Sequence, residues 1–106
     1  MVARVTPSEL KARLDAGERP VVLDVREPWE LERARLTGVV HIPMGEIPAR
    51  LGELDRGSEI IVMCRSGGRS MRVAQFLEAN GFSSVANLED GILGWARDVD
   101  PSVGTY

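Results

Sequence analysis

The segment 59–80 constrains the fold of this 106-residue chain more than any other part of the sequence. Its first five residues, Glu-Ile-Ile-Val-Met, form an apolar run rich in β-branched side chains, which predicts a strand buried on both faces. A glycine-rich turn, Cys-Arg-Ser-Gly-Gly-Arg, follows directly, and a helix is predicted over about 70–80, closed by Gly81. A strand, a tight turn and a helix in this order predict an α/β fold around a mostly parallel sheet.

The same alternation runs through the rest of the chain. The length of the chain suits one compact domain over 1–106, with a tail at about 99–106. The first helix is predicted to begin at Thr6, because Pro7 needs no hydrogen bond there and Glu9 can complete a capping box. Further strands are predicted at 3–5, 21–25, 38–42 and 84–87, and further helices at 27–33, 46–54 and 92–97.

The composition predicts a soluble cytoplasmic protein that binds neither nucleic acid nor membrane. Hydrophobic residues make up 43% of the chain, and its net charge of −3 gives no overall positive field that would attract either partner. The N-terminus has no apolar stretch suited to a signal peptide, and no later run reaches membrane-spanning length. The single cysteine, Cys64, excludes an internal disulfide, and with the single histidine, His41, it offers no metal-ligand set. We therefore expect neither a metal nor an organic cofactor.

Cys64 stands at the carboxyl end of the strand predicted at 59–63, where α/β proteins commonly bind ligands. Gly67 and Gly68 can adopt backbone conformations that other residues avoid, so successive N–H groups of this loop can point to one position. The N-terminus of the following helix adds unpaired N–H groups and a partial positive charge. The loop is therefore predicted to cradle an anion, with the sulfur atom of Cys64 at its centre.

Three arginines, Arg65, Arg69 and Arg72, are predicted to cluster around Cys64 in an otherwise mildly acidic chain. Cations and a helix N-terminus stabilise a thiolate, so we expect the pKa of Cys64 to lie below the free value of about 8.5. A persulfide on Cys64 would also be anionic, and the same N–H groups would hold its outer sulfur. This interpretation requires that the sulfur be reachable from water and that the loop amides point at it.

Each of these residues also has a structural interpretation. A lone cysteine after an apolar strand is often a small buried hydrophobic residue, but packing gives no reason for a cationic glycine-rich loop beside it. Asp24 and Arg26 lie at the end of the strand predicted at 21–25 and could be mistaken for catalytic groups. We expect them to form a structural ion pair, with Glu30 as a further partner.

The length of the loop favours sulfur transfer over phosphoryl transfer. Cysteine-dependent phosphatases place five residues between the cysteine and the closing arginine, whereas four separate Cys64 from Arg69. The shorter loop makes a cradle too tight for a tetrahedral phosphate but adequate for one sulfur atom. A phosphatase or an arsenate reductase is the weaker alternative, because the loop is short and no resolving cysteine is present.

Three segments, in the right order, resemble the rhodanese family. The loop CRSGGRS at 64–70 resembles the active-site loop of single-domain thiosulfate sulfurtransferases. The segment LDVREPWELERARLTGVVHIP at 23–43 resembles the first signature of the family, and VANLEDGILGWARD at 85–98 resembles the closing signature. The chain departs from the family at residues 34–35, Ala-Arg in place of a frequent Gly-His, and at Asp90, in place of a frequent second glycine.

The resemblance implies a rhodanese-like three-layer domain with a five-stranded, mostly parallel sheet flanked by helices. It implies that Cys64 is the nucleophile that forms a persulfide and that Arg69 binds and polarises the anionic sulfur donor. The other residues expected to bind substrate in the loop are Arg65, Ser66, Gly67, Gly68 and Ser70.

The reaction expected from this resemblance moves sulfur from thiosulfate, or a similar small anion, through Cys64 to cyanide or a thiol acceptor. The acceptor must come from outside the chain, because no second cysteine exists to displace the sulfur. The alternative is a persulfide carrier or interaction module that relays sulfur from a desulfurase to a protein or a tRNA-modifying partner. Turnover of thiosulfate would separate the two, since the carrier would turn over negligible amounts.

Overall fold

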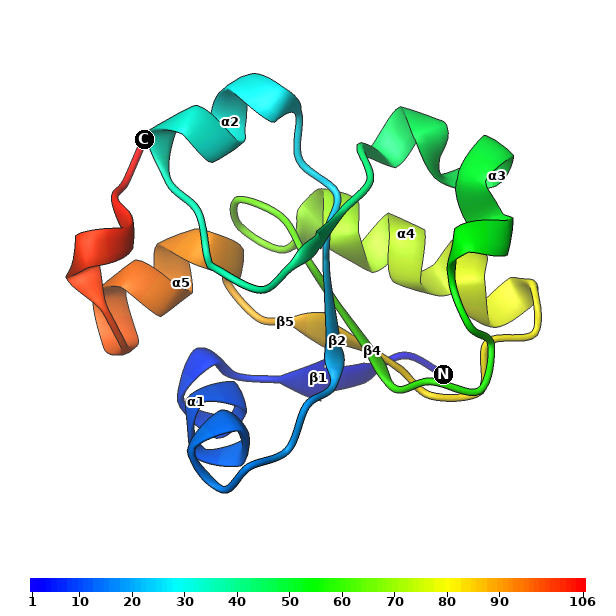
Figure 1. Ribbon diagram of the computed structural model, residues 1–106, viewed down its shortest axis with the longest axis horizontal. Helices are drawn as coiled ribbons and strands as arrows, with labels where there is room; N and C mark the ends of the chain where they lie inside the picture. The colour runs from blue at the N-terminus through cyan, green and yellow to red at the C-terminus, as the bar shows by residue number, and fades with distance from the viewer.

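The strands form one parallel sheet in which the strand before Cys64 is central. In a computed structural model that describes residues 1–106, the sheet order is β1-β5-β4-β2-β3, and every neighbouring pair is parallel (Figure 1). The fold class predicted from the sequence is therefore confirmed, including the five strands that the family resemblance implies. The strands are β1 (Ala3–Val5), β2 (Val21–Asp24), β3 (Val40–His41), β4 (Ile60–Met63) and β5 (Val85–Leu88).

Helices cover both faces of the sheet and make it the middle of three layers. Figure 1 shows α1 (Pro7–Asp15) and α4 (Gly68–Ala79) on opposite sides of the strands. Strand β4 is buried throughout and divides its side chains between two apolar clusters, as the two-residue period of a strand requires. Ile60 and Val62 pack in the cluster that includes Val73 of α4, whereas Ile61 and Met63 pack in the cluster on the α1 face.

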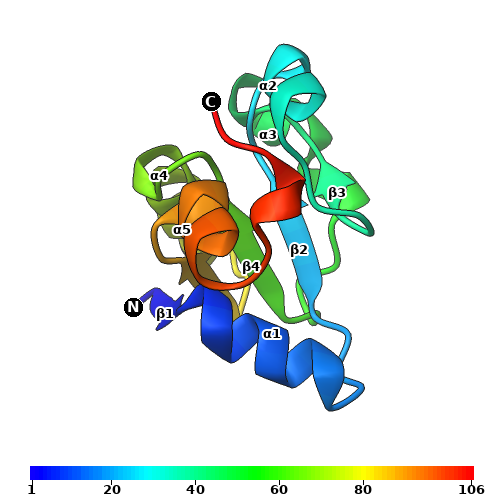
Figure 2. The same cartoon turned by 90° about the vertical axis from the view of Figure 1, so that its left-hand side faces the viewer.

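The remaining helices complete these layers. On the α1 face, α5 (Gly91–Asp98) contributes the buried Trp95 to the same apolar cluster as Leu10 of α1. On the other face, α3 (Ile47–Arg50) contributes Ile47 to the cluster below α4. Helix α2 (Pro28–Arg33) follows the carboxyl end of β2 and, in the views of Figures 1 and 2, lies beside the C-terminal segment.

Most predicted elements occur with boundaries shifted by one or two residues. Helix α4 begins at Gly68, two residues before the predicted start, so the glycine pair belongs partly to the helix. The predicted capping box of α1 is present, because the amide of Glu9 donates to Thr6 Oγ1 at 3.1 Å and the amide of Thr6 donates to Glu9 Oε1 at 2.9 Å. The strand predicted at 38–42 is reduced to the two residues of β3.

The single helix predicted at 46–54 is wrong. The segment forms a 3₁₀ turn at Met44–Glu46, the four residues of α3 and a second 3₁₀ turn at Leu51–Glu53. Pro48 lies in the first turn of α3, where its missing N–H is tolerated, and Gly52 has low helix propensity. These two residues divide the segment into short turns.

The interpretation of residues 99–106 as a simple tail is also wrong. Pro101–Val103 form a 3₁₀ turn, and Val99, Val103 and Tyr106 pack against the apolar cluster that contains Trp95. Figure 2 shows this segment, in red, rising from the end of α5 toward α2. The segment therefore reaches the carboxyl edge of the sheet, next to the cysteine loop.

No helix in the structure combines the length and the apolar character that crossing a membrane requires.

Candidate active site

The loop after β4 directs hydrogen-bond donors at the sulfur of Cys64. Gly67 caps α4 with a φ of 108°, in the left-handed region that favours glycine. The Gly67 amide donates to Cys64 Sγ at 3.1 Å. The hydroxyl of Ser70, in the first turn of α4, lies 3.3 Å from the same sulfur. The predicted convergence of loop donors on the sulfur is therefore present.

The surroundings of Cys64 favour its thiolate. Burial raises the pKa of the Cys64 thiol, but the Ser70 hydroxyl and the backbone amides of Ser70, Gly67 and Ser66 lower it. The donors outweigh the burial, so the pKa lies below its ordinary value. The direction agrees with the sequence-based expectation, although a hydroxyl and backbone amides supply it more than arginines do.

The sulfur is far less open to water than the sequence-based interpretation required. Cys64 is 1% exposed and packs in the apolar cluster that includes Val62 and Val73. The expectation of an open thiol is therefore wrong, because the short loop closes over the side chain. This conformation therefore does not meet the requirement that the sulfur be reachable from water, and sulfur transfer would need the loop to open. A persulfide would lengthen the side chain by about 2 Å, which brings its outer sulfur nearer to the loop surface.

The N-terminus of α5 supports the loop from the sheet side. The amide of Ile92 donates to the Cys64 carbonyl at 3.0 Å, and the amide of Leu93 donates to the Arg65 carbonyl at 3.1 Å. Gly91 permits this close approach, since a Cβ atom there would lie 2.3 Å from the Cys64 carbonyl oxygen. Asp90, which replaces a frequent glycine of the family, adopts a φ of 59°, so it keeps the left-handed conformation without the glycine.

Arg69 is held beside the loop by a carboxylate from α2. Its Nη1 and Nη2 atoms donate to the two oxygens of Glu30 at 2.6 and 2.8 Å, and Glu30 is only 3% exposed. These bonds to Arg69, with smaller contributions from Tyr106 and the Glu27 amide, lower the pKa of Glu30 to about 2 against burial, which raises it. The Glu30 carboxylate in turn raises the pKa of Arg69. Glu30 thus orients an arginine whose charge interacts with Cys64.

Asp24 and Arg26 form the expected ion pair, and both are fully buried at the end of β2. Arg26 Nε donates to Asp24 Oδ1 at 2.9 Å, and Arg26 Nη2 donates to Asp24 Oδ2 at 2.7 Å. The Arg26 carbonyl also lies 2.7 Å from His41 Nε2, which connects β3 to this corner. Glu30 is the expected further partner through its backbone, because Arg26 Nη1 donates to the Glu30 carbonyl at 3.5 Å. The Glu30 carboxylate instead binds Arg69 and Tyr106.

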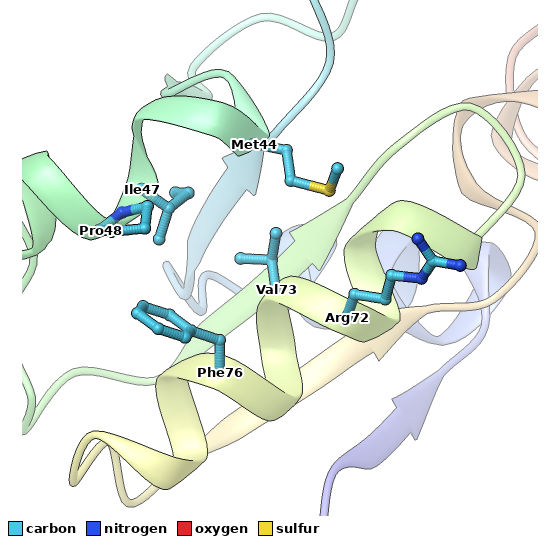
Figure 3. Close-up of a pocket in the computed structure, with 6 residues that line it drawn as sticks. All are labelled: Met44, Ile47, Pro48, Arg72, Val73 and Phe76. Carbon is cyan, nitrogen blue, oxygen red and sulfur yellow. The ribbon is translucent and has the colours of Figure 1, made fainter.

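Of the three arginines predicted to cluster around Cys64, Arg65 is bound by the C-terminal residue and Arg72 borders a separate pocket. Arg65 Nε donates to the Tyr106 carbonyl at 2.9 Å, and its guanidinium lies 5.1 Å from the centroid of the Tyr106 ring. Arg72 borders an apolar pocket of about 170 Å³ between α4 and α3, with Met44 and Phe76 among its lining residues (Figure 3). Four of the six residues of that pocket are hydrophobic, and Arg72 is the one charged residue among them.

Sequence reasoning missed two residues of the site. Tyr106 donates its hydroxyl proton to Glu30 Oε2 at 2.5 Å, accepts from Arg26 Nη1 at 3.1 Å, and lies 76 positions from Glu30 in the chain. Asn87 lies in β5. Its Oδ1 atom accepts from the Ser70 hydroxyl at 2.5 Å, and its Nδ2 atom donates to the Gly67 carbonyl at 3.2 Å. The Asn-Leu pair of the closing signature was a sequence signal for Asn87, whereas nothing local marked Tyr106.

Two clefts flank the cysteine loop. The larger, of about 640 Å³, combines the loop arginines with residues of α2 and the C-terminal segment. The second, of about 450 Å³, lies on the β5 side and includes Ser66, Gly67 and Asn87. Only the larger cleft contains Arg69 and offers a cationic approach to the loop. Its lining residues are Glu27, Trp29, Glu30, Arg33, Arg65, Arg69 and Tyr106.

The Glu30 pair gives the first testable prediction, the pH dependence of stability. A carboxyl whose pKa falls from 4.5 to about 2 on folding stabilises the folded state by about 3 kcal/mol above pH 5, and this contribution is lost as the pH falls through 2. Glu30→Gln should therefore lower the free energy of unfolding by about that amount at pH 7, and the difference from wild type should shrink toward pH 2. Urea unfolding at several pH values measures it.

Glu46→Gln is the matched control, because it removes one member of an exposed ion pair with Arg50 and should change stability by less than about 0.5 kcal/mol. An effect of Glu30→Gln that stays constant from pH 7 to pH 2 would contradict the prediction.

Comparison with known proteins shows which family the chain resembles. The model of the Rhodanese-like domain family matches residues 6–98. YtwF of Bacillus subtilis, provisionally named a sulfurtransferase, is 36% identical over 100 residues, which cover 94% of this chain and 96% of YtwF. YrkF of the same organism, provisionally named a sulfur carrier protein, is 38% identical over 94 residues, which cover 89% of this chain and 51% of YrkF. This chain thus spans about half the length of YrkF.

A solved structure shares the whole architecture. The crystal structure of a rhodanese-like domain protein from Staphylococcus aureus is similar with a TM-score of 0.84 and 31% sequence identity, over 89% of this chain and 91% of that one. The family match spans β2, the cysteine loop, Asn87 and α5, which are the parts that build the site. The chain therefore belongs to the family of rhodanese-like domains.

Proposed function

We propose that this protein is a sulfurtransferase that carries sulfane sulfur on Cys64, taking it from thiosulfate or a similar anion and giving it to cyanide or a thiol. The observation that carries the proposal is the Gly67 amide 3.1 Å from Cys64 Sγ, in a loop whose other donors also favour a thiolate. A sulfur anion held by neutral donors in a four-residue cradle is suited to nucleophilic attack and to leaving again.

The reaction needs no oxidant or reductant. The Cys64 thiolate attacks the outer sulfur of thiosulfate, the S–S bond of thiosulfate breaks, and sulfite leaves with the bonding electron pair. An acceptor nucleophile then attacks the outer sulfur of the persulfide, and the Cys64 thiolate leaves with the electron pair of the S–S bond. Cyanide becomes thiocyanate, and a thiolate acceptor becomes a persulfide. Because the thiolate is regenerated, each cycle returns the protein to its first state.

Arg69 is the residue that we assign to the anionic donor. Its guanidinium lines the larger cleft, keeps N–H groups beyond the two bound to Glu30, and is coupled electrostatically to Cys64. Bidentate pairing with Glu30 fixes its plane before the donor arrives, and such preorganised cations stabilise charge that shifts during reaction. Ser66, Gly67 and Gly68 serve through their backbone, and Arg65 borders the same cleft.

A persulfide carrier is the second candidate, favoured by the similarity to YrkF and by the burial of Cys64. In this case sulfur arrives from a protein donor such as a cysteine desulfurase and passes to a protein or a tRNA-modifying partner. Either function requires a reduced cysteine, so we expect the protein to act in the cytoplasm.

Mass spectrometry after incubation with thiosulfate tests the proposal. Wild type should gain one sulfur atom at Cys64, cyanide should remove it with formation of thiocyanate, and Cys64→Ser should gain none. Labelling by a cysteine desulfurase but not by thiosulfate would favour the persulfide carrier over the thiosulfate-using enzyme. No labelling by either donor would overturn both candidates, and Cys64-dependent hydrolysis of an aryl phosphate would favour a phosphatase instead.

The contribution of Arg69 can be measured in the same thiosulfate:cyanide assay. Arg69→Ala should lower kcat/KM for thiosulfate by about 10- to 100-fold, because it removes a charged donor from the reacting anion. Arg97→Ala is the matched control, since Arg97 of α5 forms only exposed ion pairs with Asp90 and Asp98. Equal rates for the two variants would mean that Arg69 does not bind the donor. Urea unfolding of both variants separates a lost contact from lost structure.

A further inference from the structure

The Ser70 hydroxyl has more acceptors than protons to give. Its oxygen lies 2.5 Å from Asn87 Oδ1, 3.2 Å from the Gly67 carbonyl oxygen and 3.3 Å from Cys64 Sγ. A serine hydroxyl carries one proton, so it can donate fully to only one of the three. Ser70 is completely buried and Asn87 is 5% exposed, so water cannot easily supply a second proton.

The orientation of Asn87 is fixed by the loop itself. Its Nδ2 atom donates to the Gly67 carbonyl at 3.2 Å, and turning the amide over would bring two oxygens together at that point. Asn87 Oδ1 therefore faces Ser70 whatever the state of the sulfur. The parallel register that pairs Asn87 with Val62 of β4 keeps this amide next to the strand that carries Cys64.

We propose that the Ser70 hydroxyl is a two-position donor, which serves Asn87 while the Cys64 sulfur is neutral and turns to the sulfur when it becomes a thiolate. A neutral thiol is a weak acceptor, so the amide oxygen at 2.5 Å holds the proton in that state. A thiolate is a charged acceptor, and hydrogen bonds to charged groups are about twice as strong as neutral ones. Asn87 is thus a positioning residue that acts on Cys64 through Ser70.

Asn87 opposes formation of the thiolate in this arrangement. When Ser70 turns to the sulfur, Asn87 Oδ1 loses the only donor that the structure gives it and stays buried. A buried acceptor without a donor is unfavourable, so the Asn87 amide favours the position in which the hydroxyl donates to Oδ1. The loop donors lower the pKa of Cys64, and Asn87 limits how far it falls.

The two positions of the Ser70 hydroxyl act as a switch that has a consequence for sulfur transfer. This consequence rests on the proposed function. In a persulfide the charge lies on the outer sulfur and Cys64 Sγ is neutral, so the hydroxyl serves Asn87. When an acceptor attacks the outer sulfur, the S–S bond breaks and its electron pair passes to Sγ. Ser70 then turns to the departing thiolate and stabilises it, and the O–H bond is never broken.

Removing the Asn87 amide leaves the charged groups around Cys64 unchanged. Helix α5 contributes only backbone amides to the Cys64 and Arg65 carbonyls. On the side of the loop that faces α2, the charged groups are Arg69 with its partner Glu30, the Asp24–Arg26 pair at the end of β2, and Arg65. On the β5 side they are Arg4 of β1 with Glu89, and Asp90 with Arg97 of α5.

The pH dependence of alkylation by iodoacetamide tests the proposal on the full chain, whose single cysteine makes the signal unambiguous. Asn87→Leu, similar in volume but without an acceptor, should lower the pH midpoint of alkylation by about one pH unit. At a pH below the midpoint, the variant would then hold about ten times more thiolate than wild type. Ser70→Ala should raise the midpoint. The double variant should match Ser70→Ala, because Asn87 has no route to the sulfur once the hydroxyl is gone.

A shift from Asn87→Leu that is equally large in the Ser70→Ala background would overturn the proposal, since Asn87 would then act through the Gly67 carbonyl. An unchanged midpoint in the wild-type background would also overturn it. If the leucine variant does not fold, Asn87→Ala serves in the same four-way comparison. Alkylation reports only the thiolate, whereas mass spectrometry reports bound sulfur, so failure of this switch and failure of sulfur transfer are separate results.

Discussion

Gly91→Ala is expected to lower the free energy of unfolding by about 3–5 kcal/mol, a large part of the 5–15 kcal/mol typical of such domains. The new Cβ would lie 2.3 Å from the Cys64 carbonyl oxygen and 2.6 Å from the carbonyl atoms of Arg65. These are backbone atoms, so no side chain can rotate away to relieve the contact. A φ of 54° at this position adds the strain of a left-handed residue with a side chain.

Gly91→Ala should also disturb the cysteine loop, in addition to lowering the stability of the whole fold. Moving α5 away from Cys64 breaks the bonds from the Ile92 and Leu93 amides that hold the loop carbonyls. Urea unfolding measures the stability, with Gly68→Ala as the control in the same loop. A Cβ at Gly68 meets no atom within 4 Å, so that variant should stay within about 1 kcal/mol of wild type. Equal losses in the two variants would refute the close approach of α5.

Asp24→Asn is expected to destabilise the protein by about 3–5 kcal/mol, because it leaves the guanidinium of Arg26 buried without a counter-ion. Both side chains are 0% exposed, and Asp24 accepts from Nε and Nη2 of Arg26 and from the Arg26 amide. Asparagine keeps the shape of the side chain, so the measured loss reflects the charge. An amide group facing the guanidinium also places two donors against each other.

Arg97→Ala is the control, because it removes two ion pairs that are exposed and should cost less than about 1 kcal/mol. Replacing both buried partners, as Asp24→Leu with Arg26→Met, should be less harmful than Asp24→Asn alone, since no charge is then left unpaired. Urea unfolding of the four proteins decides this. If Asp24→Asn proves as mild as Arg97→Ala, the buried pair does not hold the end of β2.

Local signals in the sequence were sufficient for the fold and for the donors that the loop directs at Cys64. The apolar run before Cys64, the glycine-rich turn and the capping box at Thr6 each involve residues within a few positions of one another, and each predicts its structure directly. The Asp24–Arg26 pair was predictable for the same reason, since its members are two positions apart at the end of a strand. The direction of the Cys64 pKa also followed from a loop and a helix start that adjoin in sequence.

Contacts between distant segments decided the rest. Glu30 binds Arg69 across 39 positions, Asn87 reaches Ser70 across 17, and Tyr106 reaches Glu30 across 76, so no local pattern could assign these partners. The sequence by itself determined which residues form the cradle, because chain neighbours build it. Only the tertiary structure decided how deeply Cys64 is buried and which arginine stays beside it, because burial and charge pairing depend on segments that packing alone brings together.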